Sequence, residues 1–454
     1  MSPNTNDTTA TTADFSALLD KFKHADAHIG IIGMGYVGLP LAIAAVQGGF
    51  NTTGFDVDPT KIEALNVGQS YLKHIPTEAI TELKSENKFS ITTDFSGLTQ
   101  MDAIIICVPT PLSEDHGPDL SYVISSTEMI AKYLRTGQLV ALESTTYPGT
   151  TAEVMKPILE AGGLKAGTDF FLAYSPERED PGNPTHETRT IPKVVGGDGA
   201  RALELALALY GNIVEQTVPV SSLDTAEAVK LTENIFRSVN IALANELKLI
   251  YGKMGIDVWE VIEAAKSKPF GFMPFYPGPG LGGHCIPIDP FYLTWRARQF
   301  GQETLFIELA GKINTAMPAH VVGVLAEELD RRTGKGLSVA NILLIGIAYK
   351  KNIDDVRESP AFAILELLEG RGAKTSFYDP YAGEIPKTRE HMTLAGRTSI
   401  DWAPERLGDY DAALICTDHD DIDYAELVKH SRLVIDSRNA TRDITEGRDK
   451  VVMA

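Results

Sequence analysis

The sequence predicts an α/β protein in which two Rossmann-like, doubly wound domains are joined by a long central helix. From His28, a β-branched strand, a glycine turn and an Ala-rich helix follow one another. A proline-free stretch from Leu223 to about Met254 has apolar residues at helical spacing. A second alternation of strands and helices begins at Asn341, where N-I-L-L-I-G echoes the first strand. The expected divisions are a flexible N-terminal tail (1–27), a dinucleotide-binding domain (28–216), a central helical domain (217–330) and a C-terminal Rossmann-like domain (331–454).

The composition is that of a soluble globular protein with several domains. Its 454 residues are 43% apolar and 22% charged, and no apolar run reaches the roughly 18 residues of a membrane span. Three cysteines cannot build a disulfide framework, and the Thr- and Asn-rich start lacks the layout of a secretory signal. The formal charge of −20 argues against nucleic acid or a lipid surface as a partner. We therefore expect a cytoplasmic protein that binds no membrane and no nucleic acid and holds an anionic ligand through local cations.

The first glycine turn predicts a dinucleotide site. Its residues are Gly33, Met34, Gly35, Tyr36, Val37 and Gly38, which fit G-x-G-x-x-G between a strand and a helix. The second strand ends at Asp56, 18 positions after Gly38, where a carboxylate that binds the adenosine ribose is expected. No arginine follows to meet a 2′-phosphate, so NAD is favoured over NADP.

Three further strands end in polar turns. The apolar runs are Ala103–Val108, Gln138–Leu142 and Phe170–Ala173. In a parallel sheet such turns meet at the carboxyl edge, beside the cofactor crevice. The candidate residues there are Thr110, Thr145, Glu177 and Arg178. The alternative for each threonine is that it only caps its turn.

The long central helix carries Lys230 and Asn234 on one face, because they stand four residues apart. On its own such a pair is typical of a solvated stripe. A helix of this length also suits a spine between domains and the interface of a homodimer or a higher homo-oligomer.

The loop from Pro277 to Pro290 carries the candidate nucleophile, Cys285. This cysteine lies near Asp289 and outside any apolar run, whereas Cys107 and Cys416 lie within apolar runs and are expected in core strands. The alternative is an ordinary buried cysteine in a turn. Glycines at 278, 280, 282 and 283 leave the backbone bare before Cys285, so a ligand is expected to lie against the main chain there.

We expect the second Rossmann-like unit to bind a different ligand from the first. Its first turn lacks G-x-G-x-x-G and carries Lys350, Lys351 and Arg357, and Arg438 lies in its last turn. These side chains offer cations to an anion.

A cysteine beside a nicotinamide indicates oxidation beyond the aldehyde. A thiol adds to an aldehyde to give a thiohemiacetal, whose hydride leaves to a second NAD, and water hydrolyses the resulting thioester to an acid. Two alternatives are a two-electron hydroxyacid or polyol dehydrogenase and a non-catalytic nucleotide-sensing protein. The first leaves Cys285 unexplained, and the second leaves the whole set of reactive residues unexplained.

The combined motifs resemble those of the nucleotide-sugar 6-dehydrogenases, the family of UDP-glucose and UDP-N-acetylhexosamine dehydrogenases. G-x-G-Y-V-G-L-P, K-x-x-x-N, G-x-G-G-x-C-x-x-x-D and K-K-x-x-x-D-x-R-x-S occur in the family's order between about His28 and Arg438. The resemblance implies an NAD cofactor, a UDP-sugar substrate and no metal.

The resemblance also implies roles for single residues. Cys285 would be the nucleophile, Lys230 and Asn234 would stabilise the oxyanion at C6 with an ordered water, and Asp289 would support the base. Glu177 would serve thioester hydrolysis, with Thr145 near the water. The other implied contacts are Lys61 and Arg357 with the cofactor, and Tyr276, Gly278, Gly280, Gly282, Lys350 and Arg438 with the substrate.

One stretch departs from the glucose enzymes. Where they usually have P-E-F-L-x-E-G, this chain has P-E-R-E-D-P-G, with Arg178 for the phenylalanine and Pro181 for the second glutamate. This form, together with G-G-H-C-I-P-I-D-P, resembles UDP-N-acetylglucosamine 6-dehydrogenases of polysaccharide pathways. We expect Arg178 and its loop to accommodate the 2-acetamido group, with UDP-N-acetylmannosamine and UDP-glucose as the alternative substrates.

Overall fold

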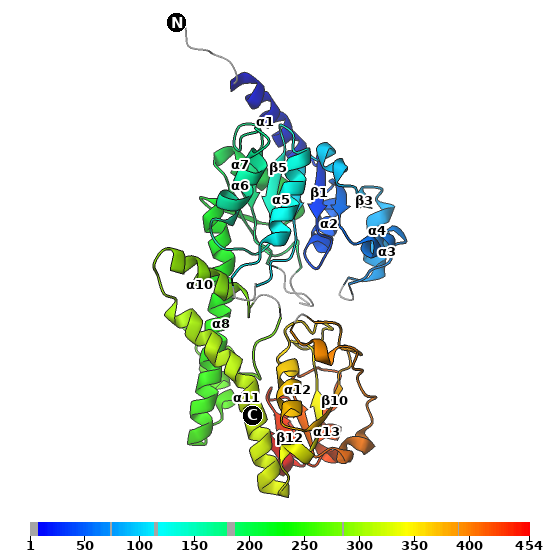
Figure 1. Ribbon diagram of the computed structural model, residues 1–454, viewed down its shortest axis with the longest axis vertical. Helices are drawn as coiled ribbons and strands as arrows, with labels where there is room; N and C mark the ends of the chain where they lie inside the picture. Colours follow the sequence, from blue (N-terminus) through cyan, green and yellow to red (C-terminus); the bar gives the residue numbers. More distant parts are fainter. Residues whose placement is uncertain (1–7, 73–74, 113–116, 179–186, 284–285, 389) are drawn as a thin grey trace. The chain divides into compact units, whose positions relative to one another are not determined.

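The computed structural model describes residues 8–72, 75–112, 117–178, 187–283, 286–388 and 390–454, with side chains from residue 15 onward. The chain divides into two compact units (Figure 1). The first takes in the chain up to Glu233 and returns for Trp295–Gln302, and the second comprises Asn234–Thr294 and Glu303–Ala454. The chain passes between the units three times: within the helices α8 (Leu223–Met254) and α10 (Asp289–Gln299), and between Gln302 and Glu303 in the loop after α10.

The first unit is built on one mixed sheet. In its described part the strand order is β3-β2-β1-β4-β5-β6-β7-β8, and every neighbouring pair is parallel except β6 with β7. The strands are β1 (His28–Ile32), β2 (Asn51–Phe55), β3 (Phe89–Thr92), β4 (Ala103–Ile106), β5 (Leu139–Leu142), β6 (Phe171–Tyr174), β7 (Lys193–Gly197) and β8 (Thr217–Pro219). The order reverses direction between β1 and β4, and in such sheets this switch point is where a dinucleotide binds.

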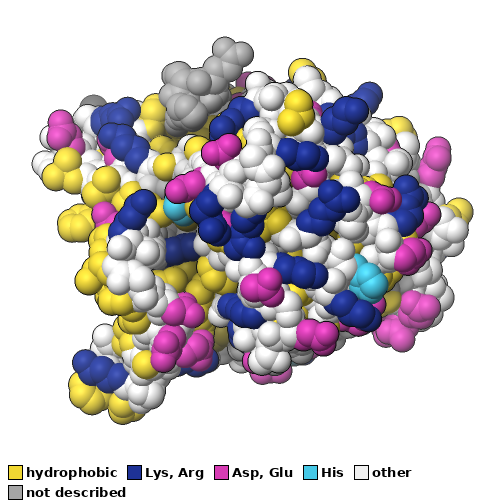
Figure 2. Space-filling view, turned by 90° about the horizontal axis from the view of Figure 1, so that it is seen from below, with side chains coloured by type: hydrophobic (Ala, Val, Ile, Leu, Met, Phe, Trp, Pro, Cys, Tyr) yellow, Lys and Arg dark blue, Asp and Glu magenta, His cyan; other side chains and the backbone are white. Residues whose placement is uncertain are grey.

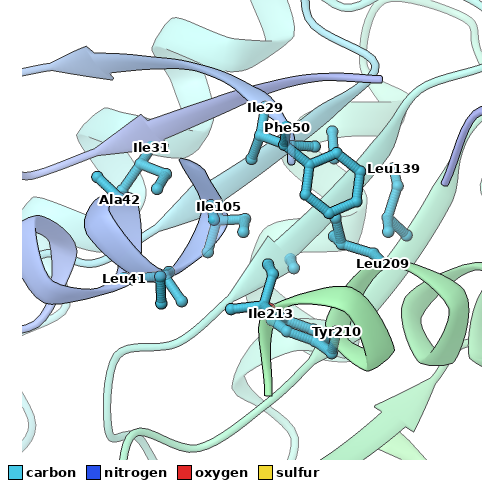
Figure 3. Close-up of a cluster of buried hydrophobic side chains, with 14 of the residues drawn as sticks. Ile29, Ile31, Leu41, Ala42, Phe50, Ile105, Leu139, Leu209, Tyr210 and Ile213 are labelled. Atoms are coloured by element: carbon cyan, nitrogen blue, oxygen red, sulfur yellow. The ribbon is translucent and has the colours of Figure 1, made fainter. Parts of the chain in front are cut away.

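Helices cover both faces of this sheet, which explains why its strands are apolar without alternation. The helices are α1 (Thr8–Lys23), α2 (Gly38–Gln47), α3 (Pro59–Asn66), α4 (Thr77–Ser85), α5 (Ser121–Tyr133), α6 (Lys156–Glu160) and α7 (Ala200–Ile213). Figure 3 shows Ile31 and Ile105 of the sheet facing Leu41 of α2 and Ile213 of α7. The neighbouring Ile104 points the other way, into a second cluster with residues of α5 and α6.

The expectation of a flexible tail over residues 1–27 is wrong for Thr8–Lys23, which forms α1. Phe15, Leu18, Leu19 and Phe22 follow the i, i+3, i+4, i+7 spacing of one helix face, and the last three are buried. The amide of Asn212 on α7 donates to the Phe22 carbonyl at 2.8 Å. The polar Thr and Asn residues upstream hide this apolar face when composition alone is considered.

Replacing Phe22 with alanine is expected to destabilise the first unit. The ring is fully buried in a core cluster that includes residues of α7 and of the sheet, and such a truncation costs about 3–5 kcal/mol of unfolding free energy. Thermal unfolding followed by circular dichroism would measure the loss, with the exposed Lys23→Ala on the same helix as the control. Unchanged unfolding of Phe22→Ala would mean that α1 is not docked in solution.

The second unit contains a smaller, fully parallel sheet. Its described strands are ordered β10-β9-β11-β12-β13. Their bounds are β9 (Asn341–Ile345), β10 (Lys374–Tyr378), β11 (Ala412–Ile415), β12 (Val434–Asp436) and β13 (Val451–Met453). This order also belongs to doubly wound folds, with a switch point between β9 and β11. The first strands of the two sheets, which are similar in sequence, also end in similar backbone conformations. Gly33 after β1 and Gly346 after β9 have φ of +92° and +78°.

Helices also cover both faces of the second sheet. Leu344 packs in a cluster with α11 and α12, and Leu343 points into another with α13. The remaining helices are α9 (Val258–Lys266), α11 (Leu305–Thr333), α12 (Pro360–Gly370) and α13 (Tyr424–His430). Short π or 3-10 turns are η1 (Phe95–Gln100), η2 (Thr150–Met155), η3 (Leu337–Val339), η4 (Met392–Leu394), η5 (Pro404–Asp409) and η6 (Arg448–Lys450).

The predicted fold class is confirmed, including the central helix α8 over Leu223–Met254. The domain boundaries stay a prediction, and α11 continues to Thr333, just past the boundary expected at 330. Within the described ranges, no helix has both the length and the apolar character required to cross a bilayer.

Candidate active site

The glycine turn after β1 has the geometry of a dinucleotide site. A Cβ at Gly33 would meet the Cys107 carbonyl oxygen at 2.5 Å, and one at Gly38 would meet the Gly33 oxygen at 1.9 Å. These two glycines are therefore required by the fold itself. A Cβ at Gly35 would meet nothing within 4 Å, so this position is open. The bare backbone of Gly35 before α2 thus fits the close approach of a pyrophosphate, and the turn fits NAD.

Asp56 lies beside this turn, directly after β2. Its Oδ2 accepts the backbone N–H of Met34 at 2.8 Å, and its Oδ1 accepts that of Asp58 at 3.0 Å. The Lys61 ammonium lies 2.8 Å from Oδ2. Three donors thus hold the carboxylate and leave one lone pair, and Lys61 is next to it as expected. The Met34 side chain is buried in the core, and Tyr36 is half-buried at the start of α2 together with Val37.

The variant Asp56→Ala is expected to weaken NAD binding about 10- to 100-fold, because it removes the predicted ribose acceptor and leaves two backbone N–H groups without this partner. Calorimetric titrations with NAD and, separately, with the UDP-sugar would measure this. Asp94→Ala is a matched control, because Asp94 also accepts a backbone N–H, from Ser96 at 2.9 Å, but is exposed. Equal loss of both ligands would contradict the ribose assignment.

The turns after β4 and β5 are held together by the two predicted threonines. The Thr110 hydroxyl donates to the Thr145 carbonyl oxygen at 2.6 Å. Thr110 is buried and Thr145 is half-buried.

The turn after β6 brings a carboxylate to the central helix. The Lys230 ammonium lies 3.7 Å from the Glu177 carboxylate, and side-chain exposures of 7% and 14% place this pair largely out of water. Two predicted residues from distant parts of the chain therefore meet. A buried ammonium and carboxylate beside each other can stabilise an oxyanion and hold a proton in a catalytic site.

Arg178 is held by protein partners. Its guanidinium lies 2.5 Å from the Glu233 carboxylate of α8 and donates to the Pro192 carbonyl oxygen at 2.5 Å. A small hollow is lined by Arg178, Glu177 and a buried Glu143–Lys193 pair. Arg178 thus shapes the wall of this hollow.

Asn234 and Asp289 form the corresponding pair of the second unit. The Asn234 amide donates to Asp289 Oδ2 at 2.5 Å, and both side chains are buried. The same helix α8 carries Lys230 and Asn234. The alternative, that these two residues form a solvated stripe, is excluded because both side chains are buried.

The candidate nucleophile Cys285 and its neighbour His284 lie outside the described residues. The other two cysteines are buried in strand ends as predicted. Burial raises the pKa of the Cys416 thiol to about 12, so this thiol is inert at neutral pH.

The expectation that Gly278, Gly280 and Gly282 leave the backbone open to a ligand is wrong. A Cβ at Gly278 would meet the Arg438 guanidinium at 2.7 Å, one at Gly280 would meet Pro360 at 2.9 Å, and one at Gly282 would meet Tyr349 at 2.6 Å. Each position is therefore closed by protein atoms. The glycines bring the loop against its own unit, rather than leaving these three positions open for a ligand.

The remaining predicted substrate and cofactor residues lie in the second unit. Tyr276 stacks on Trp259 with ring centroids 5.5 Å apart and is 36% exposed. The Lys350 ammonium lies 5.9 Å from the Tyr349 ring centroid. The Arg357 guanidinium binds Asp355 at 2.5 Å, and the Gly283 N–H donates to the Arg357 carbonyl at 3.0 Å. The contact of Arg357 with the cofactor stays a prediction.

Sequence reasoning missed two buried polar groups that hold these loops. The Asn245 Oδ1 on α8 accepts the Gly278 N–H at 3.0 Å, and its amide donates to Asn314 of α11 at 2.9 Å. Glu227, also on α8, accepts hydrogen bonds from the turn after β5, and burial raises its pKa to about 7. Both are polar residues on the apolar face of a long helix, and this pattern in the sequence could have indicated that they are buried and bound to a partner.

Comparison with known proteins agrees with this geometry. Models of the UDP-glucose/GDP-mannose dehydrogenase family match in order: the NAD binding domain at 27–214, the central domain at 224–316 and the UDP binding domain at 343–443. A UDP-N-acetyl-D-mannosamine dehydrogenase of Pyrococcus horikoshii is 35% identical over 422 residues, 91% of this chain and 96% of that protein.

A UDP-N-acetyl-D-glucosamine 6-dehydrogenase of Pseudomonas aeruginosa is 36% identical over 399 residues, 87% of this chain and 91% of that protein. The solved structure of a UDP-D-ManNAc dehydrogenase from Pyrococcus horikoshii matches with a TM-score of 0.83 at 35% identity, covering 94% of this chain and 98% of that one. The chain therefore belongs to the UDP-glucose/GDP-mannose dehydrogenase family of NAD-dependent oxidoreductases, and it carries that family's UDP binding domain.

Proposed function

We propose that this enzyme oxidises the C6 hydroxymethyl group of UDP-N-acetyl-D-glucosamine to the carboxylate. The observation that carries the proposal is the buried Lys230–Glu177 pair at the edge of the sheet that bears the NAD turn. Bound NAD supplies the acceptor for hydride, and two NAD are consumed for each sugar. The product would be a uronic acid sugar nucleotide for polysaccharide synthesis.

The proposed reaction consists of two oxidations at C6 followed by hydrolysis of a thioester. The alcohol loses a proton and a hydride to become an aldehyde, and the Cys285 thiolate then forms a C–S bond to C6. Loss of a second hydride turns the thiohemiacetal into a thioester, which water cleaves to free the acid and the thiol. Lys230 and Asn234 would donate to the oxygen at C6 as its charge develops, with Asn234 held by Asp289.

Glu177 and Thr145 are proposed for the hydrolytic step. The Glu177 carboxylate would take a proton from the attacking water, since it is largely out of bulk water and the Lys230 ammonium lies 3.7 Å away. Thr145 lies in the turn that Thr110 fixes, so its hydroxyl would be a stationary hydrogen-bonding partner for this water.

The UDP group is proposed to bind in the second unit. Because the chain carries a net charge of −20, a diphosphate needs local cations, and Lys350 and Arg438 offer two. Arg438 lies against Gly278 of the loop from Tyr276 to Gly282. The backbone N–H groups of this loop, other than that of Gly278, which Asn245 accepts, would supply further donors.

The choice of sugar rests on the stretch that contains Arg178. The relatives described above are named for both N-acetylglucosamine and N-acetylmannosamine substrates. We favour the former because S-P-E-R-E-D-P-G-N and G-G-H-C-I-P-I-D-P occur together. Since its guanidinium is bound to Glu233 and Pro192, we propose that Arg178 makes room for the acetamido group by fixing its loop.

A homodimer is proposed through the central helix. Large apolar side chains are exposed on α8 and α11, namely Phe236, Leu243, Leu249, Ile250, Met254, Leu305, Phe306 and Leu309. Figure 2 shows apolar side chains gathered at the left edge of the face that it presents. Exposed apolar surface of this extent is typical of an interface. Light scattering after size exclusion would test the dimer, and a monomer mass at micromolar concentration would contradict it.

The decisive experiment counts the NADH formed at completion per mole of sugar nucleotide. UDP-N-acetylglucosamine, UDP-N-acetylmannosamine and UDP-glucose would be run in parallel. Two NADH from the first alone supports both the four-electron chemistry and the sugar. Two NADH from another of these sugar nucleotides would mean that this one is the substrate. One NADH would favour a two-electron dehydrogenase, and none from all three would favour a different substrate or a sensing role.

A further inference from the structure

Glu227 is a fully buried carboxylate that the proposed chemistry does not use. Its Oε2 accepts the backbone N–H of Gly149 at 2.7 Å. Its Oε1 accepts the backbone N–H of Thr151 at 2.9 Å and the Thr151 hydroxyl at 2.6 Å. Three donors thus converge on the two oxygens of Glu227, which makes this side chain a firm anchor for the turn.

The anchored segment is the turn after β5, which contains Thr145. At its start, the Thr145 carbonyl oxygen is held by the Thr110 hydroxyl at 2.6 Å. At its end, Gly149 has a φ of +105°, and a Cβ there would lie 2.6 Å from the Arg296 guanidinium. The turn is therefore fixed at both ends, and Glu227 fixes the end that meets α8.

Glu227 also shares a helix face with the candidate catalytic lysine, because Lys230 follows it by three residues on α8. The Lys230 ammonium lies 3.7 Å from the Glu177 carboxylate. All these groups belong to the first compact unit. Displacement of the Glu227 anchor would thus shift the Thr145 turn relative to Lys230 and Glu177.

We propose that Glu227 is a positioning residue that sets the Thr145 turn against the part of α8 that carries Lys230. The proposal rests on the proposed function, in which Thr145 and Lys230 serve the same reacting carbon. If Glu227 served only folding, a small shift of this turn would leave the reaction rate unchanged. In a catalytic site, by contrast, a misplacement of a reacting group by about 1 Å can lower the rate about a hundredfold.

The test is the pair of variants Glu227→Gln and Thr151→Val, assayed with NAD and UDP-N-acetylglucosamine. Glutamine keeps the shape, but in either orientation its NH2 group faces a backbone N–H. We expect kcat to fall about 10- to 100-fold while KM for the sugar nucleotide and Kd for NAD stay within about twofold. Thr151→Val removes only the hydroxyl donor, so we expect a smaller loss of kcat, about three- to tenfold.

Asp102→Asn is the matched control for a purely structural effect. Asp102 is a buried carboxylate of the same unit that accepts the His28 N–H at 3.0 Å and pairs with Lys21 at 2.9 Å, at the amino end of the sheet. We expect this variant to lower the melting temperature without lowering kcat. A similar loss of kcat in Asp102→Asn and Glu227→Gln would overturn the positioning role.

A kcat of Glu227→Gln or of Thr151→Val within about twofold of wild type would also overturn it. If Glu227→Gln does not fold, Thr151→Val decides alone. The yield of NADH per sugar separates this proposal from the function beneath it. A positioning residue changes the rate but not the number of NADH formed per sugar. A wild-type yield other than two would therefore contradict the four-electron function. The positioning role is judged only by the rates of the variants relative to wild type.

Discussion

Replacement of Cys285 with alanine is expected to abolish formation of the uronic acid while NAD affinity stays unchanged. Without the thiol, no C–S bond forms at C6, and the second hydride has no thiohemiacetal to leave from. Loss of a covalent nucleophile costs at least about a thousandfold in kcat. The acid would be measured by mass spectrometry and NAD affinity by calorimetry.

Cys416→Ala is the matched control, because it removes a buried, inert thiol from the core of the second unit. We expect this variant to form acid at a rate within about twofold of wild type. Acid formation by Cys285→Ala at the wild-type rate would mean that Cys285 is not the acyl carrier. Loss of folding in Cys285→Ala alone would mean that the cysteine is structural.

Replacement of Lys230 with methionine is expected to lower kcat about 100- to 1,000-fold, with a smaller change in KM. Methionine fills much of the same space, so the variant removes a charge from a site where the ammonium is 7% exposed. Without it, the developing charge at C6 loses a donor and Glu177 loses its buried partner. Single-turnover measurements of NADH formation would show whether the first oxidation is slowed.

Lys156→Met is a suitable control for this variant, since Lys156 also pairs with a carboxylate in the first unit, that of Asp198 at 2.7 Å, but with 33% of its side chain exposed. We expect its kcat to match wild type, because exposed pairs contribute little. Equal rates for Lys230→Met and wild type would remove Lys230 from the catalytic set.

The sequence predicts the elements whose signals are local. The glycine turn at Gly33, the carboxylate at Asp56 and the helix Leu223–Met254 follow from spacing within short windows, and the structure has each of them. The missed helix α1 had the same kind of local signal, in the spacing of Phe15 and Phe22, but its polar start was given more weight.

Contacts between side chains are harder to predict when the two residues are far apart in the sequence, because no local pattern indicates that they meet. Glu227 and Thr151 are 76 residues apart, and Arg178 and Glu233 are 55 apart. Periodicity places Glu227 on α8 but cannot show which turn of the sheet meets it. The loop glycines illustrate the same limit, since Gly278 is required by Arg438, which lies in the turn after β12.

The first unit has a consequence for synthesis on the ribosome. Its last segment, Trp295–Gln302, is translated only after residues 234–294 of the other unit. Trp295 packs on Tyr147 with ring centroids 4.9 Å apart, and Arg296 pairs with Glu153 of η2. These contacts close the turn that contains Thr145. The sheet of the NAD-binding domain can therefore form early during translation, but the turn that contains Thr145 is completed only after residues 295–302 have been synthesised.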